Sequence, residues 1–227
     1  MKNKKKIFIL IFFIFFINLE KVYSEQFNFE AKKILIEDSG NILKAKDGVE
    51  ITADNGIKIT ANNFLYNKTS LVLIVEGNVE IYNYKNNLKI FGEKFTYEKK
   101  NEKIFSESEV NAILDGRYNL KTKELNYFIL EEKISSNKKS ILTDDLKNII
   151  ESDDFYFLIA ESIYKSNKLT YKDSIGNKTL INSAMLNTKN NQILGKDLEI
   201  NFNNQSFGNS KNEPRLKGNA LFINKDK

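Results

Sequence analysis

The sequence predicts an all-β protein built from a repeat of about 30 residues. Apolar and polar residues alternate with a period of two from Ile57 to Tyr97, which is typical of strands with one buried face. The alternation changes phase between Ala61 and Phe64, and again between Gly92 and Phe95. One extra residue moves every later side chain to the other face, so we expect a bulge or a corner at both places.

Composition excludes several classes of function. The 227 residues suffice for one or two modest domains, with 29% charged and 41% hydrophobic residues. The net charge of +5 comes mostly from the first 24 residues, because the remainder carries 30 basic and 29 acidic residues. Without a basic stripe we expect no nucleic-acid partner. The absence of His and Cys excludes thiolate nucleophiles, histidine bases and Cys/His zinc sites, and we expect no cofactor.

Residues 1–24 have the pattern of a secretory signal peptide. A lysine-rich start precedes an unbroken apolar run of 11 residues, Ile7–Ile17. Val22 and Ser24 occupy the small-residue positions of a cleavage site before Glu25. The apolar run is shorter than the roughly 20 residues that span a bilayer, although an uncleaved N-terminal anchor stays open as an alternative. In both cases residues 25–227 are predicted to be exported as one domain.

A marker recurs through the exported part and sets the repeat. It has a small or polar residue, two further residues, an apolar residue, any residue and often an aromatic one. It occurs as AKKILI from Ala31, ANNFLY from Ala61, GEKFTY from Gly92, TKELNY from Thr122, SDDFYF from Ser152 and, weakly, NSAMLN from Asn182. One unit cannot bury its own apolar face, so neighbouring units must stack.

A second apolar pair follows about fifteen residues after the apolar residue of the marker. It is found at Val49/Ile51, Val79/Ile81, Val110 and Ile200/Phe202, and we find no clean pair in the fourth and fifth units. Residues that tolerate positive φ precede it, so we predict hairpin turns at Asp47-Gly48, Glu76-Gly77-Asn78 and Gly218-Asn219. Further turns are expected at Asn86-Asn87, Asn101 and Asn190-Asn191.

Residues 142–150 also have helical spacing behind the acidic pair Asp144-Asp145. With repeats on both sides we favour strand or loop there. The pairs Asp144-Asp145 and Asp153-Asp154 are interpreted as solvated turns, because neither lies in a glycine-centred calcium loop. No nucleophile–base arrangement, phosphate loop or metal cluster is visible, so we expect neither catalytic residues nor an enzyme.

The alternation nominates a set of interior side chains. They are Ile57, Ile59, Phe64, Leu73, Val75, Val79, Ile81, Leu88, Ile90, Phe95 and Tyr97. The pattern leaves the architecture open between barrel, sandwich, jelly roll and β-solenoid. It also leaves open whether these residues form a packed core or line an apolar trough that holds a ligand.

Two units, ANNFLYNKTSLVLIVEGNVEIY and GEKFTYEKKNEKIFSESEV, resemble the organic-solvent-tolerance (OstA-like) repeats of lipopolysaccharide transport proteins. The resemblance covers roughly Phe27 to Asn224. The segment PRLKG at Pro214–Gly218 resembles one late in the N-terminal periplasmic domain of the LPS-assembly protein LptD. With the repeats filling the chain, we expect an isolated domain of this kind or a stand-alone LptA-like protein.

The resemblance implies an elongated, folded-over β-jelly roll in the periplasm, associated with the outer membrane of a Gram-negative cell. It implies that lipopolysaccharide passes along the apolar interior and that the interior residues named above contact the lipid. Expected partners are an LptA-like jelly-roll protein of the bridge, joined through edge strands, and an outer-membrane barrel or its lipoprotein plug. Phe27–Ile36 is the expected docking edge. The alternative is an exported structural or adhesive β-solenoid with a solid core and no lipid.

Overall fold

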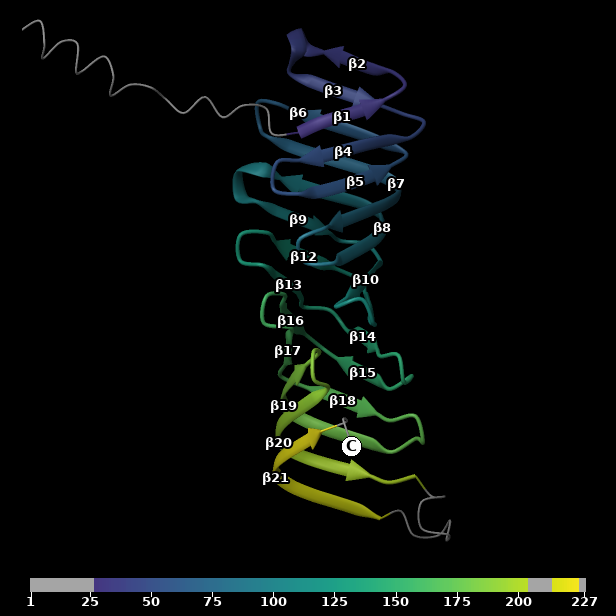
Figure 1. Cartoon of the computed structure of the whole chain (residues 1–227), viewed down its shortest axis with the longest axis vertical. Helices are drawn as coiled ribbons and strands as arrows, with labels where there is room; N and C mark the ends of the chain where they lie inside the picture. The colour runs from purple at the N-terminus through teal and green to yellow at the C-terminus, as the bar shows by residue number, and fades with distance from the viewer. Residues whose placement is uncertain (1–26, 204–213, 225–227) are drawn as a thin grey trace, which may run out of the picture.

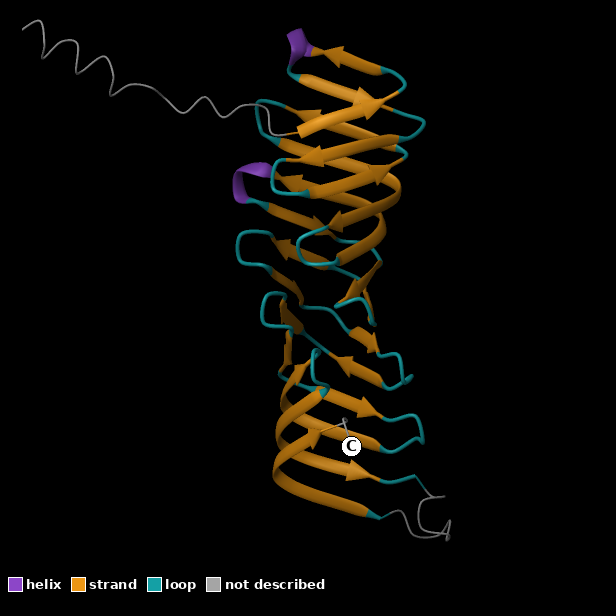
Figure 2. Cartoon of the chain, in the orientation of Figure 1, coloured by secondary structure: helices purple, strands orange, loops and turns teal. Residues whose placement is uncertain are grey.

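The structure is a computed structural model that describes residues 27–203 and 214–224. Within these residues the chain forms a single antiparallel sheet of 21 strands, folded lengthwise into two facing walls (Figure 1). Figure 2 shows that strands and short loops make up nearly all of the described chain. In this described part of the chain the helical segments are two single 3₁₀ turns, η1 (Asp38–Gly40) and η2 (Lys99–Asn101). The predicted all-β, elongated, folded-over jelly roll is confirmed, and the predicted signal peptide lies outside the described residues.

The first wall, here called wall A, contains eight short strands. They are β2 (Ile34–Glu37), β3 (Ile42–Ala45), β6 (Asn63–Asn67), β9 (Lys103–Ser106), β12 (Leu125–Phe128), β13 (Lys133–Ser136), β16 (Phe155–Leu158) and β17 (Ile163–Ser166). Each presents alternate side chains to the interior, as the period of two predicts.

The second wall, wall B, also contains eight short strands. They are β1 (Phe27–Ala31), β4 (Val49–Ala53), β5 (Ile57–Ala61), β10 (Val110–Leu114), β11 (Tyr118–Thr122), β14 (Ser140–Thr143), β15 (Ile149–Ser152) and β18 (Leu169–Lys172). Residues 142–150, whose spacing is also helical, thus form two strands and a turn, because Leu142 and Ile150 complete the interior of this wall while Leu146 is exposed in the turn.

Five long strands belong to both walls and make the sheet continuous. They are β7 (Val72–Asn83), β8 (Leu88–Glu98), β19 (Lys178–Asn187), β20 (Gln192–Asn201) and β21 (Arg215–Asn224). β7, β8 and β19 each pair with a short strand of wall A over one half and of wall B over the other half. β20 and β21 extend both walls by pairing with β19 and β20 along their length. Because the sheet bends at the midpoint of these strands, the two walls share one closed side, which we call the spine.

The markers lie at the spine, where the chain passes from wall B to wall A. The chain turns at Asn62 between β5 and β6, which explains the first change of phase. At the second, the pairing of β7 with β8 shifts between Glu76 and Val79, so that two residues of β7 face one of β8. Both predicted corners are therefore confirmed, and the second is a bulge inside paired strands.

Each repeat of about 30 residues accordingly contains four strand segments, two on each wall. The predicted hairpin turns at Asp47-Gly48, Glu76-Gly77-Asn78 and Gly218-Asn219 are wrong. Asp47-Gly48 links β3 of wall A to β4 of wall B, and the other two lie inside β7 and β21. Gly77 adopts a positive φ of 82° because the bulge at the spine requires it. A hairpin turn favours glycine for the same reason, so the sequence alone does not distinguish the two.

The hairpin turns lie on the side opposite the spine. The turns of wall A stack in a column, because each binds the turn one repeat earlier; Lys99 N donates to Leu71 O at 3.0 Å and Ile129 N to Glu102 O at 2.9 Å. The turns expected at Asn86-Asn87, Asn101 and Asn190-Asn191 are confirmed.

The second apolar pair needs two corrections. The fourth and fifth units do have a pair on wall B, at Ser140/Leu142 and Leu169/Tyr171. In the fourth unit a buried serine, Ser140, occupies one of the two interior positions, so the apolar pattern alone does not reveal this strand. In the last unit the interior residues of wall B are Leu198 and Ile200, whereas Phe202 lies beyond the end of β20.

Candidate functional site

The interior between the walls is lined by two long cross-strand rows of side chains. The row of wall A consists of register-paired neighbours and runs through Ile36, Leu43, Tyr66, Leu73, Tyr97, Ile104, Tyr127, Ile134, Phe157, Tyr164, Leu186, Ile193 and Ile223. Every member is apolar or aromatic, so a continuous apolar surface extends along the wall.

Wall B faces it with an equivalent row. It runs through Phe29, Ile51, Ile59, Ile81, Ile90, Ala112, Leu120, Leu142, Ile150, Tyr171, Thr179, Ile200 and Leu216. Thr179 is the one polar member. The two rows together make an apolar layer that follows the whole length of the described chain.

All eleven candidate interior residues point into this layer. Ile57, Ile59, Val79, Ile81, Leu88 and Ile90 belong to wall B, whereas Phe64, Leu73, Val75, Phe95 and Tyr97 belong to wall A. None is more than 4% exposed. The sequence therefore identifies the interior face correctly, and the structure places these residues in a packed core.

In the N-terminal half the two walls touch. Phe27 of β1 lies against two tyrosines of wall A, with ring centroids 5.3 Å from Tyr66 and 5.2 Å from Tyr97. Phe29 stacks on Phe64 at 4.7 Å. Aromatic contacts of this kind contribute beyond the burial of their area, so this part of the interior is held closed by packing.

The apolar layer is less covered at its two ends. Phe29, Ala31 and Ile34 are only partly buried at the N-terminal end. Ile200, Leu221 and Ile223 are partly buried at the C-terminal end. Among the described residues, β1, β2 and β21 each pair with one neighbouring strand, so both ends present strand edges. Phe27–Ile36, the expected docking edge, does lie at an end of the sheet.

On the side opposite the spine, three polar clusters join the turns of wall B to those of wall A. We call them latches 1, 2 and 3. Each contains a tyrosine hydroxyl and an asparagine side chain from opposite walls. The latches satisfy the polar ends of tyrosines whose rings lie in the core, because an unpaired buried hydroxyl would be costly.

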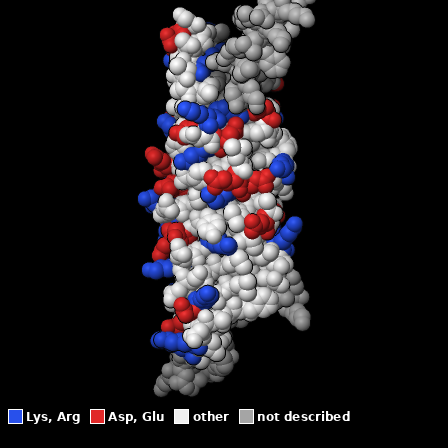
Figure 3. Space-filling view, turned by 90° about the vertical axis from the view of Figure 1, so that its left-hand side faces the viewer, with Lys and Arg blue, Asp and Glu red and all other residues white. Residues whose placement is uncertain are grey.

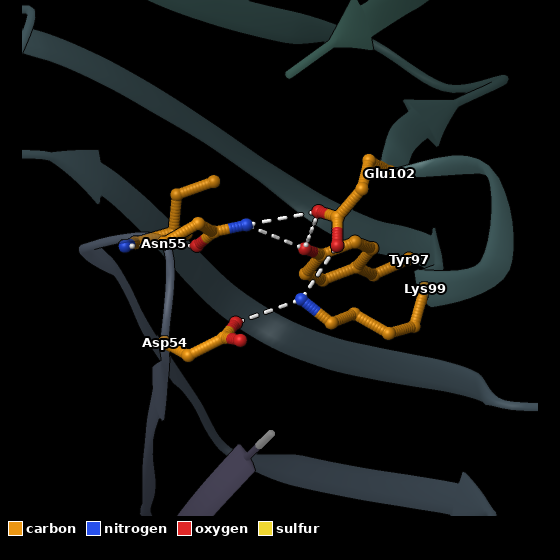
Figure 4. Close-up of polar contacts among 6 residues, drawn as sticks. Asp54, Asn55, Tyr97, Lys99 and Glu102 are labelled. Carbon is orange, nitrogen blue, oxygen red and sulfur yellow. Dashed lines mark hydrogen bonds and ion pairs between the residues drawn. The ribbon is translucent and has the colours of Figure 1, made fainter. Parts of the chain in front are cut away.

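Latch 1 is shown in Figure 4. Asn55 of wall B donates to the Tyr97 hydroxyl at 2.8 Å and to Glu102 Oε2 at 2.9 Å, and the Tyr97 hydroxyl donates to the same oxygen at 2.6 Å. Lys99 lies between two carboxylates, with Nζ 2.8 Å from Asp54 Oδ1 and 2.6 Å from Glu102 Oε1. The Lys99 side chain is buried, so these two carboxylates replace its water shell.

Latch 2 follows one repeat later. Asn83, at the end of β7, donates to the Tyr127 hydroxyl at 2.6 Å, and both residues are buried. Lys85 of the next turn forms an ion pair with Glu132 at 2.5 Å. The tyrosines of latches 1 and 2, Tyr97 and Tyr127, are the aromatic residues that close the marker in two successive units.

Latch 3 joins residues more than seventy positions apart. Tyr118 of wall B donates to Asn191 Oδ1 at 2.6 Å, and Arg117 donates to the same oxygen at 2.5 Å. Arg117 also donates to the Thr188 carbonyl, and Thr188 donates to Asp115. Here wall B binds the turn 188–191 of wall A instead of the preceding turn 159–162. The offset between the repeats of the two walls therefore changes by one repeat.

Beyond latch 3 the turns of wall B bind one another. Ser174 N donates to Asn148 Oδ1 at 3.1 Å, and Asn203 N donates to Asn177 Oδ1 at 2.9 Å. In Figure 1 the turns after β14 and β18 lie at the right-hand side, whereas the turn after β12 lies at the left. The walls thus diverge in the C-terminal half, and the turn residues Leu146 and Ile175 are exposed.

Asp144 corrects the interpretation of the acidic pairs. It is buried, and it accepts hydrogen bonds from Asn148 N at 2.8 Å and Asn148 Nδ2 at 2.7 Å. Asp173 binds Asn177 in the same way one repeat later. These are structural Asp-x-x-x-Asn turns, in which the aspartate satisfies the backbone. Asp154 binds Asn167 at the spine, and Asp145 and Asp153 are exposed as expected.

Burial changes the acidity of the latch tyrosines. Burial, and then the hydrogen bond to Glu102, raises the pKa of Tyr97 above its ordinary value. Burial raises the pKa of Tyr118 to about 12, while the Arg117 cation opposes the shift. The pKa of Tyr127 is also raised, mainly by burial. All three hydroxyls are therefore neutral hydrogen-bonding groups near neutral pH.

Sequence reasoning missed the latches. Their members come from turns that read only as polar connections, and the pairing across the walls depends on how the sheet folds. One signal was present, since the marker ends in tyrosine where an interior position would accept phenylalanine. Within residues 27–203 and 214–224, no group of three or more Asp or Glu could hold a metal ion. No helix in that part of the chain is long and apolar enough to cross a membrane.

No family model and no curated protein matches the chain. Among solved structures, it is similar to LptH from Pseudomonas aeruginosa, described as the LptA-homologous periplasmic component of the lipopolysaccharide transport device. The match has 12% sequence identity and a TM-score of 0.25, and it covers 58% of this chain and 74% of that one. A likeness of this size carries no argument about function.

Proposed function

We propose that the chain is a lipid-carrying module without enzymatic activity, exported to the periplasm by a signal peptide at residues 1–24. Residues 25–227 form the carrier, which takes lipopolysaccharide between its walls and passes it towards the outer membrane. The OstA-like repeats and the PRLKG segment motivate this proposal. The observation that carries it is the pair of facing apolar rows along the full length of the sheet.

The rows suit acyl chains because they offer apolar contact at every repeat and no single deep site. Each buried CH₂ group of a lipid contributes about 0.8 kcal/mol, which offsets the wall-to-wall contacts that the lipid replaces. The walls must part to admit it. They diverge beyond latch 3, so we propose that acyl chains enter there, beside the exposed Leu146 and Ile175. The eleven candidate residues would then contact lipid as it moves through the interior.

The sheet edges at the two ends suit end-to-end docking. An edge strand has free backbone groups that can pair with a strand of another protein. We propose that the edge formed by β1 and β2 docks an LptA-like jelly-roll partner. Exposed Ile36 and Leu35 of β2 would be covered by this contact. The C-terminal edge at β21 would face the outer-membrane barrel or its lipoprotein plug.

Photo-crosslinking tests the proposal in an exported form of the chain. A photoreactive residue at Val79 or Ile81 should capture lipopolysaccharide, because both side chains lie in the interior. The matched control is Glu80, which lies between them in β7 and faces outwards. Capture at Glu80 alone would contradict the proposal.

The second candidate is an exported structural or adhesive β-solenoid with a solid core. The direct contact between the walls at Phe27, Tyr66 and Tyr97 favours it. Purification in detergent-free buffer separates the two, since a carrier should retain lipid and a solid solenoid should not.

A further inference from the structure

A large hollow of about 920 Å³ lies on the outer surface of wall A, on the face turned away from the interior. It extends over β13, β16, β17 and the wall-A halves of β19, β20 and β21. The residues in the middle of these strands form a cross-strand row in register, Tyr156–Lys165–Met185–Leu194. Their buried neighbours Phe157, Tyr164, Leu186 and Ile193 point the other way, so this row belongs to the outside.

Three of the four members of the outward row, Tyr156, Met185 and Leu194, are apolar or aromatic where an outer face is normally polar, and Lys165 interrupts them. Tyr156 and Leu194 are both substantially exposed, and Met185 and Phe128 complete the apolar floor of the hollow. Figure 3 shows a face of the molecule that carries interspersed charges in its upper part and a broad uncharged area lower down. Exposed apolar surface that is concave and continuous is typical of a binding site.

Two lysines, Lys133 and Lys196, border this floor, and Lys165 lies within it, between Tyr156 and Met185. Lys133 Nζ lies 4.7 Å from the centroid of the Phe128 ring, and Lys165 Nζ lies 5.6 Å from that of Tyr156. Lys196 lines the hollow on the spine side. At these distances the ammonium groups of Lys133 and Lys165 lie over the faces of the aromatic rings, which attract cations.

The hollow carries a small excess of positive charge. Elsewhere on the outer surface, cross-strand lysines pair with glutamates, as Lys58 does with Glu50 at 2.6 Å and Lys139 with Glu151 at 2.8 Å. Among the described residues, Lys165 and Lys196 have no carboxylate within ion-pair distance. Lys133 pairs with Glu131. The one carboxylate of the lining, Asp154, accepts from the Asn167 amide at 2.9 Å and keeps its negative charge, so Lys165 and Lys196 leave the hollow with a small positive excess.

We propose that this hollow binds an anionic amphiphile with a single acyl chain, whose tail lies on the Tyr156–Met185–Leu194 floor and whose acidic headgroup contacts Lys165 and Lys196. The volume falls within the roughly 300–1,000 Å³ of small-ligand sites. A protein partner would instead require a contact of about 800 Å² on each side. The site is separate from the interior and does not depend on the proposed function.

Calorimetry with laurate, dodecyl phosphate and uncharged dodecanol tests this. Both anions should bind saturably, and dodecanol should bind at least fivefold more weakly. The tighter of laurate and dodecyl phosphate identifies whether the hollow prefers a carboxylate or a phosphate headgroup. The proposed interior site could also accept an acyl chain. Variants on the outer surface therefore decide whether the ligand binds in the hollow or in the interior.

Leu194→Glu should weaken laurate binding at least tenfold, because it places a carboxylate on the apolar floor. The matched control is Leu180→Glu, since Leu180 is 38% exposed on the outer face of wall B and Leu194 is 43% exposed. Lys165→Gln and Lys196→Gln should each weaken binding by about two- to fivefold. Lys172→Gln and Lys178→Gln on wall B should have no effect.

Three results would overturn the proposal. They are the absence of saturable binding, equal affinity for dodecanol and laurate, and binding that the wall-A variants leave unchanged. The last result would assign the ligand to the interior. If Leu194→Glu alters the circular dichroism spectrum, the two lysine variants decide, because they change charge on an exposed surface without touching the core.

Discussion

Lys99 shows how individual side chains close the side opposite the spine. Its ammonium group is buried between Asp54 and Glu102, and Nζ lies 5.8 Å from the ring centroid of Phe27 and 5.7 Å from that of Tyr97. A buried cation is tolerated when its partners are well placed, and removing one partner leaves the others uncompensated. Latch 1 therefore ties a turn of each wall to the aromatic core beneath.

Replacing Lys99 by alanine should lower the free energy of unfolding by about 2 kcal/mol, since Glu102 and Asp54 then lose their buried counter-ion. Urea denaturation measures this. Lys100→Ala is the matched control, because the neighbouring Lys100 is exposed and should change stability by less than about 0.5 kcal/mol. Equal losses in both variants would contradict the role assigned to latch 1.

Tyr118 gives a pH dependence. Its folded pKa is raised from about 10 to about 12, mainly by burial, so ionisation is easier in the unfolded chain. The stabilisation is therefore fully present below pH 10 and is lost as the pH rises from about 10 to 12. Thermal unfolding should show Tm falling over this range, and Tyr118→Phe should flatten part of the fall. If the Tm of Tyr118→Phe fell between pH 10 and 12 as steeply as that of the natural chain, folding would not raise the pKa of Tyr118.

At the scale of the elements, the spine depends on close approach between neighbouring corners. Asn62 N donates to Gly77 O at 2.8 Å, and Gly48 N donates to Asn62 O at 3.0 Å, so three successive corners are bonded to one another. A Cβ atom at Gly77 would lie 2.7 Å from Asn62 Nδ2 and 2.9 Å from Asn62 Cβ. The bulge thus requires glycine both for its φ and for space.

Gly77→Ala should destabilise the fold by about 1–2 kcal/mol more than Gly56→Ala. The two glycines have nearly the same φ, 82° and 81°, but a Cβ at Gly56 meets no atom within 4 Å. The comparison therefore isolates the contact with Asn62 from the cost of positive φ. Denaturation midpoints of the two variants provide the measurement, and equal midpoints would show that the corner relaxes without cost.

At the scale of the whole molecule, each repeat contacts mainly its neighbours along the sheet. The stability of such a stack is close to a sum of local terms, and its ends open more readily than its middle. The partly buried Ile223 belongs to β21 at one end, whereas Ile104 is fully buried in β9. A ligand that separates the two walls must therefore open the stack locally, one or a few repeats at a time.

Hydrogen exchange should therefore be fastest in β1, β2 and β21 and slowest in β7 and β8. Ile223→Ala should speed exchange in β20 and β21 while leaving β7 unchanged, because the lost contacts are local. Ile104→Ala should cost about 2–4 kcal/mol and speed exchange in the strands around β9. Uniform acceleration by Ile223→Ala would indicate a single cooperative unit instead.

The local sequence determined much of this protein. The period of two placed Ile57, Val79, Phe95 and the other candidate residues on the interior face, since neighbouring side chains of a strand must point to opposite sides. The short marker that recurs about every 30 residues located the corners, because an extra residue at a strand bend changes the phase of the apolar–polar alternation. These signals lie within one repeat, so they can be read without knowing what each strand pairs with.

The tertiary structure decided the rest. Gly77 looks the same in sequence whether its positive φ serves a hairpin or a bulge, and only the pairing of β7 with β8 shows the bulge. The latches bring together residues 42 to 74 positions apart, and latch 3 skips a repeat. The outer hollow arises where polar positions of the pattern carry Tyr156, Met185 and Leu194. Such features depend on the offset between two walls, which is a property of the whole stack, and no single repeat contains it.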